Sequence, residues 1–185
     1  EKDDELVGSA RSVKGFDLYN ALEKCEKFLE KFGGHKYAAG LTLKKENLKT
    51  FVKTFEKIVI DTINKDQLIP EVTIDMELEL KDIDNKFFRI MQQFAPFGPE
   101  NKNPVFMTKK VFDNGYGRSV GVDKQHLKLN ITNESRIKAI NCIGFSLAHH
   151  FDKAKEGKIF DICYSINENE WNGRKSLQLR LKDIK

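Results

Sequence analysis

The chain has 185 residues, of which 39% are hydrophobic and 32% are charged, as is typical of a soluble globular protein. No apolar run approaches the ~20 residues that a membrane span needs, so we expect no membrane association and a cytoplasmic location. Cys25, Cys142 and Cys163 lie far apart without Cys-x-x-Cys spacing. This pattern favours small buried side chains in a reducing compartment over disulfides or a metal site.

Charge is distributed unevenly along the chain. Residues 1–100 carry 16 Lys and Arg against 19 Asp and Glu, a net charge of −3, whereas residues 101–185 carry 16 against 9, a net charge of +7. A basic half indicates a polyanionic partner, most commonly nucleic acid. By charge alone, an ordinary lysine-rich surface is an equally good interpretation.

The first half predicts an α+β domain. Strands are expected at 6–12, at 37–43 and, from strict alternation of apolar and acidic residues, at 72–80. Asp17 is a candidate N-cap for a helix that Gly33 would end. Further helices are expected at 46–63 and 84–94. The helix after Asp17 is predicted from six residues at helical spacing, Leu18, Leu22, Cys25, Phe28, Leu29 and Phe32.

The second half predicts a small closed β-barrel of the oligonucleotide-binding (OB) type. Between the halves, residues 94–104 hold three of the four prolines, which favours a boundary or ordered linker. We therefore expect one domain at 1–95, a linker at 96–103 and the barrel at 104–185. Strands are expected near 105–112, 116–122, 126–132, 136–143, 159–166 and 175–182, with one short helix near 146–154.

A glycine pair followed by a histidine is the first candidate site. Gly33 and Gly34 would let the backbone approach a ligand, and exposed N–H groups at such a turn form an anion cradle. His35 could donate a hydrogen bond to a phosphate oxygen. Taken alone, this tripeptide also fits a simple helix end followed by a surface histidine.

A second short stretch, "GSARS" at residues 8–12, strengthens the phosphate interpretation. Ser9 offers a hydroxyl, and Arg11 offers a planar guanidinium suited to phosphate. With the later "GGHKYAAG" it resembles the DHH-associated domain of the DHH phosphoesterase family, most closely the RecJ family of single-strand-specific 5′→3′ DNA exonucleases. The stretches "FAPFGPENKNPVF" and "NEWNGRKSLQLRLKDI" resemble the start and the end of that family's OB domain.

The resemblance implies roles for particular residues. Ser9 and Arg11 would hold the terminal 5′ phosphate, and Gly33, Gly34 and His35 would contact phosphate near the scissile bond. The catalytic Asp-His-His motif and the metal-binding aspartates of the family are absent from this chain. The intact enzyme would use Mn²⁺ or Mg²⁺. Because this chain lacks the catalytic motif, we expect it to be part of a longer protein and to cleave nothing alone.

The barrel offers a second surface, because OB domains bind single strands through basic grooves and stacking aromatic rings. Trp171 lies in a polar turn and either stacks on bases or packs over a barrel end. Five phenylalanines, Phe106, Phe112, Phe145, Phe151 and Phe160, are expected in the core. The candidate contacts with single-stranded DNA are Tyr116, Arg118, Lys128, Trp171, Arg174 and Lys175.

Two alternatives stay open beside this interpretation. The chain could be a non-catalytic module whose barrel docks a repair protein, such as a single-strand-binding protein or a helicase. It could also belong to another DHH-type phosphodiesterase acting on oligonucleotides or cyclic dinucleotides, or to a tRNA-editing domain, although the barrel disfavours both. His149 and His150 are adjacent on an expected helix and therefore point about 100° apart, which favours a surface or capping role over metal binding.

Overall fold

The structure, a computed structural model, describes residues 4–98, 100–155 and 157–185. The chain divides into two compact units between Glu71 and Val72. Each unit has its own hydrophobic core. None of the helices in these described ranges has the length and apolar character of a membrane span.

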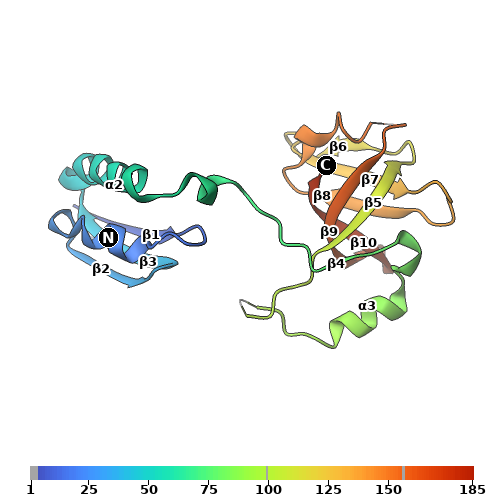
Figure 1. The fold of residues 1–185 in the computed structure, drawn as a ribbon, viewed down its shortest axis with the longest axis horizontal. Coiled ribbons are helices and arrows are strands. Elements are labelled where there is room, and N and C mark those ends of the chain that lie inside the picture. Colours follow the sequence, from blue (N-terminus) through green and yellow to red (C-terminus); the bar gives the residue numbers. More distant parts are fainter. Residues whose placement is uncertain (1–3, 99, 156) are drawn as a thin grey trace. The chain divides into compact units, whose positions relative to one another are not determined.

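The N-terminal unit is a three-stranded antiparallel sheet with helices on one face (Figure 1). β3 is central and β1 and β2 are the edges. Leu6 and Leu43 point to the covered face and pack with Leu22 and Phe51 of the helices. The elements are β1 (Glu5–Arg11), α1 (Leu18–Glu23), β2 (Lys31–His35), β3 (Ala38–Lys44) and α2 (Leu48–Thr62), with short 3₁₀ helices at Glu26–Phe28, Lys45–Asn47 and Lys65–Leu68.

The helix after Asp17 is much shorter than the apolar spacing predicted. The side chain of Asp17 does cap it by accepting a hydrogen bond from the Asn20 N–H at 3.0 Å, but α1 ends at Glu23. Phe32 lies in β2, where it pairs with Leu41 of β3 and packs in the core. The prediction that Gly33 ends a helix is wrong, because pairing with β3 outweighs the local helical pattern.

The boundary between the units differs from the predicted linker at 96–103. β4 (Met76–Glu77) pairs in parallel with β5 (Phe106–Asp113), and Leu80 and Met91 belong to the core of the second unit. Residues 72–103 are therefore part of the barrel unit. This division leaves 13 basic and 13 acidic residues in 1–71, against 19 and 15 in 72–185. The net charge of the barrel unit is modest, so a polyanion would need cations gathered on one face.

The second unit is a closed barrel of OB type, as predicted. Its strands follow in the order β5, β9, β10, β8, β7, and β7 pairs again with β5 to close the ring. β8 and β10 run parallel, and a short 3₁₀ helix at Ala148–His150 stands in place of the expected helix near 146–154. The remaining elements are a 3₁₀ helix at Leu80–Asp82, α3 (Asn85–Gln92), β6 (Arg118–Val120), β7 (His126–Thr132), β8 (Ile140–Gly144), β9 (Phe160–Trp171) and β10 (Arg174–Ile184).

Helix α3 lies against one end of the barrel (Figure 1). Asp84 caps it by accepting a hydrogen bond from the Phe87 N–H at 2.7 Å. The ring of Phe87 meets Phe106 edge-on at a centroid distance of 5.6 Å, and Met91 is buried in the core. α3 is therefore part of the barrel unit and not of the preceding domain to which the prediction assigned it.

Candidate nucleic-acid interface

The predicted phosphate-binding residues lie on both edges of the N-terminal sheet, opposite the same central residues. Ser9 of β1 and Gly33 of β2 both pair with Gly40 of β3. Neighbouring strands are about 4.8 Å apart, so the backbones of Ser9 and Gly33 are roughly 10 Å apart across β3. Gly40 has no side chain, so the backbone of β3 is exposed between Ser9 and Gly33.

Arg11 and His35 are placed in the same way, one on each side of Ala38. Side chains of paired residues, and of alternate residues on one strand, point to the same face of a sheet. Ser9, Arg11 and His35 therefore point to a single face, and it is the face that the helices leave exposed. The register of the three strands therefore places Ser9, Arg11 and His35 on one exposed face.

The two glycines have different surroundings. A β-carbon at Gly34 would lie 2.3 Å from the Ala38 carbonyl oxygen and 2.6 Å from the Ala39 Cα, and the φ of Gly34 is 144°. Gly34 therefore permits close packing between β2 and β3, and is not the position that makes room for a ligand. A β-carbon at Gly33 would meet nothing within 4 Å, so Gly33 is the glycine that leaves space.

His35 is held by its own turn. The Tyr37 N–H donates to Nδ1 of His35 at 3.3 Å, which leaves Nε2 as the nitrogen that can present a proton to an anion. The turn is anchored because the Ser12 N–H donates to the Tyr37 carbonyl at 2.9 Å and the Leu18 N–H donates to the Lys36 carbonyl at 3.1 Å. The glycines that were predicted to form an anion-binding turn lie instead in the edge strand β2. Alternate N–H groups of an edge strand point away from the sheet and have no partner strand.

Three of the predicted DNA contacts in the barrel lie together. Tyr116, Arg118 and Lys128 line one hollow with Asn130 and Asn141. Arg118 of β6 pairs directly with Lys128 of β7, and the ring of Tyr116 is 63% exposed. This hollow lies on the outer face of β7 and β8 beside the β5–β7 connection, where OB folds bind oligonucleotides.

A buried carboxylate shapes the loop that carries Tyr116 and Arg118. Asp113 is 3% exposed. Its Oδ2 accepts a hydrogen bond from the Gly117 N–H at 2.7 Å, and its Oδ1 accepts one from the Asn130 N–H at 2.9 Å. Asp113 therefore fixes this loop to β7.

Trp171 and Arg174 close the β9–β10 hairpin as directly opposed residues. Asn172 and Gly173 form the two-residue turn between them with φ values of 49° and 74°, as a type I′ turn requires. The indole of Trp171 is 74% exposed, so it does not pack over the barrel end. An exposed aromatic ring beside an arginine is the arrangement that the stacking interpretation predicts.

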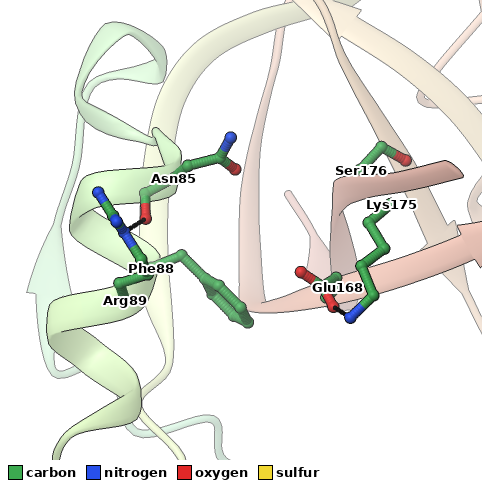
Figure 2. A pocket seen from close by; sticks show the side chains of 6 residues that line it. All are labelled: Asn85, Phe88, Arg89, Glu168, Lys175 and Ser176. Atoms are coloured by element: carbon green, nitrogen blue, oxygen red, sulfur yellow. Dashed lines mark hydrogen bonds and ion pairs between the residues drawn. The ribbon is translucent and has the colours of Figure 1, made fainter.

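Lys175 does not share that face. It pairs with Glu170 in the hairpin, and its Nζ donates to Glu168 Oε2 at 2.7 Å. Figure 2 shows a groove with α3 on one side and Lys175 and Glu168 on the other. The ring of Phe88 projects from α3 into this groove. The charge of Lys175 is therefore compensated by Glu168, and alternation along β10 places it on the other side from Arg174.

One further aromatic side chain, Phe145, lies on the outer face of the barrel. Phe145 was predicted to be a core residue, but it is 48% exposed, and that prediction is wrong. The guanidinium carbon of Arg180 lies 5.0 Å from the Phe145 ring centroid, and the His126 ring meets Phe145 edge-on at 5.1 Å. Strict alternation along β8 continues through Gly144 and would have placed Phe145 outside. Of the other four phenylalanines, Phe106 and Phe160 are buried and Phe112 and Phe151 are partly buried.

One of the two adjacent histidines, His150, lies beside a carboxylate. Nε2 of His150 lies 3.3 Å from Asp183 Oδ1. Burial, more than the nearby His149 and Lys153, lowers the pKa of His150, against an opposing effect of Asp183. Within the described ranges, no three His, Cys, Asp or Glu side chains are placed to hold a metal ion.

Known protein families match both units of the chain. A family model described as the RecJ OB domain matches residues 74–183, and a DHHA1 domain model matches residues 1–61. The single-stranded-DNA-specific exonuclease RecJ of Bacillus subtilis (strain 168) is 34% identical over 95% of this chain and 22% of its own length. RecJ of Escherichia coli (strain K12) is 26% identical over 98% of this chain and 32% of its own length.

Solved structures show the same fold. The crystal structure of RecJ from Thermus thermophilus in complex with Mn²⁺ has a TM-score of 0.66 and 21% identity, covering 97% of this chain and 25% of that one. The Mg²⁺ complex has a TM-score of 0.65 over 96% of this chain. The chain thus spans between a fifth and a third of these relatives. Because the OB model covers more than half of its residues, the chain belongs to the RecJ OB domain family, with a DHHA1 domain before the barrel.

Proposed function

We propose that this chain is the part of a RecJ-like, single-strand-specific 5′→3′ DNA exonuclease that grips the substrate in DNA repair and recombination. The sheet of the DHHA1 domain would hold the 5′ phosphate, and the barrel would hold the following single strand. The observation that carries the proposal is the exposed sheet face on which Ser9, Arg11 and His35 flank Gly40 and Ala38.

The chemistry of that face suits a phosphate. Arg11 is exposed and presents several N–H donors, although Nη1 now donates to the Ala10 carbonyl at 2.8 Å. Ser9 offers a hydroxyl and His35 its Nε2, and both are exposed on the same face. Charge-assisted bonds to a phosphate are about twice as strong as neutral ones, so Arg11 would contribute most.

Hydrolysis would require the divalent cation that the intact enzyme binds, Mn²⁺ or Mg²⁺, and that ion would activate water and stabilise charge on the phosphate. The described residues of this chain do not fit such a site, because no suitable cluster of ligands exists among them. We therefore assign no catalytic or metal-binding residue here and propose that the chain alone binds without cleaving. A cytoplasmic location is part of the proposal. So is a protein partner, such as a single-strand-binding protein or a helicase, for which these residues single out no docking surface.

The test is fluorescence anisotropy of the chain with a labelled single-stranded oligonucleotide carrying either a 5′ phosphate or a 5′ hydroxyl, beside the matching duplex. We expect salt-sensitive binding that prefers the single strand and the 5′ phosphate. Arg11→Ala should remove the preference for the 5′ phosphate, whereas Lys14→Ala, a nearby exposed cation after the end of β1, should leave it intact. A preference unchanged in Arg11→Ala would refute the phosphate role of this face.

A protein-docking module predicts a different result. If the barrel mainly docks another protein, charge reversal at Arg118 and Lys128 will leave DNA affinity unchanged. If the barrel guides the strand, the same reversal will weaken binding and reduce its dependence on salt.

A further inference from the structure

Four carboxamide side chains form a continuous row across the outer face of the barrel. Asn130 of β7 pairs with Asn141 of β8, Asn141 pairs with Gln178 of β10, and Gln178 pairs with Asn167 of β9. Asn130 Nδ2 also donates to Asn141 Oδ1 at 3.0 Å. With strands about 4.8 Å apart, this amide row is roughly 14 Å long.

The amide row faces outward. Asn130 and Asn141 each lie between two buried core residues, Leu129 and Ile131 on β7 and Ile140 and Cys142 on β8. Gln178 lies between the partly buried Leu177 and the buried Leu179, and Asn167 directly follows the buried Ile166. The four amides are exposed or partly exposed. They are not a buried polar network that the fold needs for packing.

A cationic row runs beside the amide row. Arg118 pairs with Lys128, Lys128 pairs with Ile143, and Ile143 pairs with Arg180. Lys128 and Arg180 each lie two residues from an amide on the same strand, Asn130 and Gln178, which is about 6.8 Å. The hollow lined by Arg118, Lys128, Asn130 and Asn141 lies between the two rows.

This arrangement is not explained by a solvated surface. Asparagine is depleted in strands, because its short polar side chain packs poorly there and favours turns. Threonine is the polar residue that is enriched in strands. Three asparagines and a glutamine in register across four strands therefore act against local preference, which indicates a function for the amides themselves.

We propose that the amide row binds the edges of unpaired bases while the cationic row holds the phosphates of the same strand, an inference that rests on the proposed binding of single-stranded DNA. Each carboxamide offers two donors and an acceptor, and proteins read single strands on the Watson–Crick and Hoogsteen edges of splayed bases. An amide that can donate or accept tolerates any of the four bases. The surface would thus require bases without selecting their sequence.

The proposal predicts that affinity depends on the bases as well as on the phosphates. The assay compares a labelled mixed-sequence single strand with an abasic strand of equal length and equal phosphate count, both titrated with the full 185-residue chain at several salt concentrations. We expect the wild type to bind the abasic strand more weakly. Asn141→Leu, which keeps the size but removes the hydrogen bonds, should lower affinity for the base-containing strand roughly 3- to 10-fold and leave the abasic strand and the salt slope unchanged.

Two matched variants separate the rows. Asn141→Gln keeps the carboxamide and should retain most of the affinity. Arg180→Gln should weaken binding to both strands alike and reduce the salt slope by about 0.7, the value for one lost contact to a single-strand phosphate. Asn141 is exposed, so these variants should fold, and circular dichroism will verify it.

Three results would count against the inference. Equal wild-type affinity for abasic and base-containing strands would overturn it, and so would an equal loss for both strands in Asn141→Leu. In either case single-strand binding itself, and with it the proposed function, would stand. If the wild type binds neither strand at low salt, the proposed function of the barrel fails and the assignment of the amide row fails with it.

Discussion

The adjacent glycines Gly33 and Gly34 provide a sharp test of how the phosphate face is built, because the same substitution should act on different properties. A β-carbon at Gly34 would lie 2.3 Å from the Ala38 carbonyl oxygen and 2.6 Å from the Ala39 Cα. Both are backbone atoms of β3, so Gly34→Ala would force the two strands apart. Gly33→Ala would place its methyl group in open space on the exposed face.

The cost of Gly34→Ala can be estimated from two effects. The φ of 144° at Gly34 is unfavourable for alanine by about 1–3 kcal/mol, and overpacking against the β3 backbone adds about 1–3 kcal/mol. A domain of this size is stable by only about 3–10 kcal/mol. Gly34→Ala should therefore remove much of the free energy of unfolding of the N-terminal unit, whereas Gly33→Ala should be neutral or slightly stabilising.

Hydrogen exchange measured by mass spectrometry can assign the effect to one unit. Gly34→Ala should lose amide protection in peptides that cover β3, while peptides from the buried barrel strands β7 and β9 should keep their protection and show that the second unit is unchanged. Gly33→Ala should keep its protection but bind a 5′-phosphorylated oligonucleotide more weakly. Equal protection in both variants, or loss of protection in Gly33→Ala, would refute the assignment of packing to Gly34 and ligand space to Gly33.

Three further predictions concern the barrel unit. Asp113→Ala should lower the free energy of unfolding by roughly 2–4 kcal/mol, because two backbone N–H groups lose a charged acceptor. Asp113→Asn should lower the free energy of unfolding by less. Equal melting temperatures of the wild type and Asp113→Ala would contradict the role of Asp113 in fixing the loop. Because burial lowers the pKa of His150 below its ordinary value of 6.5, the unfolded state binds more protons and stability should fall as pH drops through about 6.5. This loss of stability at low pH should be smaller in His150→Gln. If the melting temperatures of the wild type and His150→Gln drop equally between high and low pH, His150 does not cause the pH dependence. Trp171→Ala should weaken single-strand binding by about 1–3 kcal/mol without changing the melting temperature, since the ring is 74% exposed; an unchanged anisotropy titration would exclude stacking.

Features set by a few neighbouring residues could be predicted from the sequence. Asp17 caps α1 as expected from residue type alone, because a cap needs only the next three residues. The apolar alternation of the barrel strands and the turn residues Asn172 and Gly173 are equally local. The phosphate-face candidates Ser9, Arg11, Gly33, Gly34 and His35 could be proposed from the sequence because their motifs are continuous, and their role stays a prediction.

Features that depend on pairing between distant strands required the tertiary structure. The helical spacing of Phe28 and Phe32 wrongly predicted a helix through Phe32. Phe32 instead lies in β2 and pairs with Leu41 of β3, and this pairing between strands cannot be predicted from the local sequence. The unit boundary was displaced for the same reason, because β4 pairs with a strand about 30 residues later.

The contrast is clearest at the two candidate surfaces. The sequence by itself determined which residue types are available, namely a serine and an arginine in one stretch, a histidine after two glycines in another, and asparagines within strands. Only the register of β1, β3 and β2 decided that Ser9, Arg11 and His35 share one exposed face. Only closure of the barrel through the parallel β8–β10 pair aligned Asn141 with Gln178. A shift of one residue in either register would turn these side chains to the opposite face, so the location of each surface is a property of the paired strands and not of any one segment.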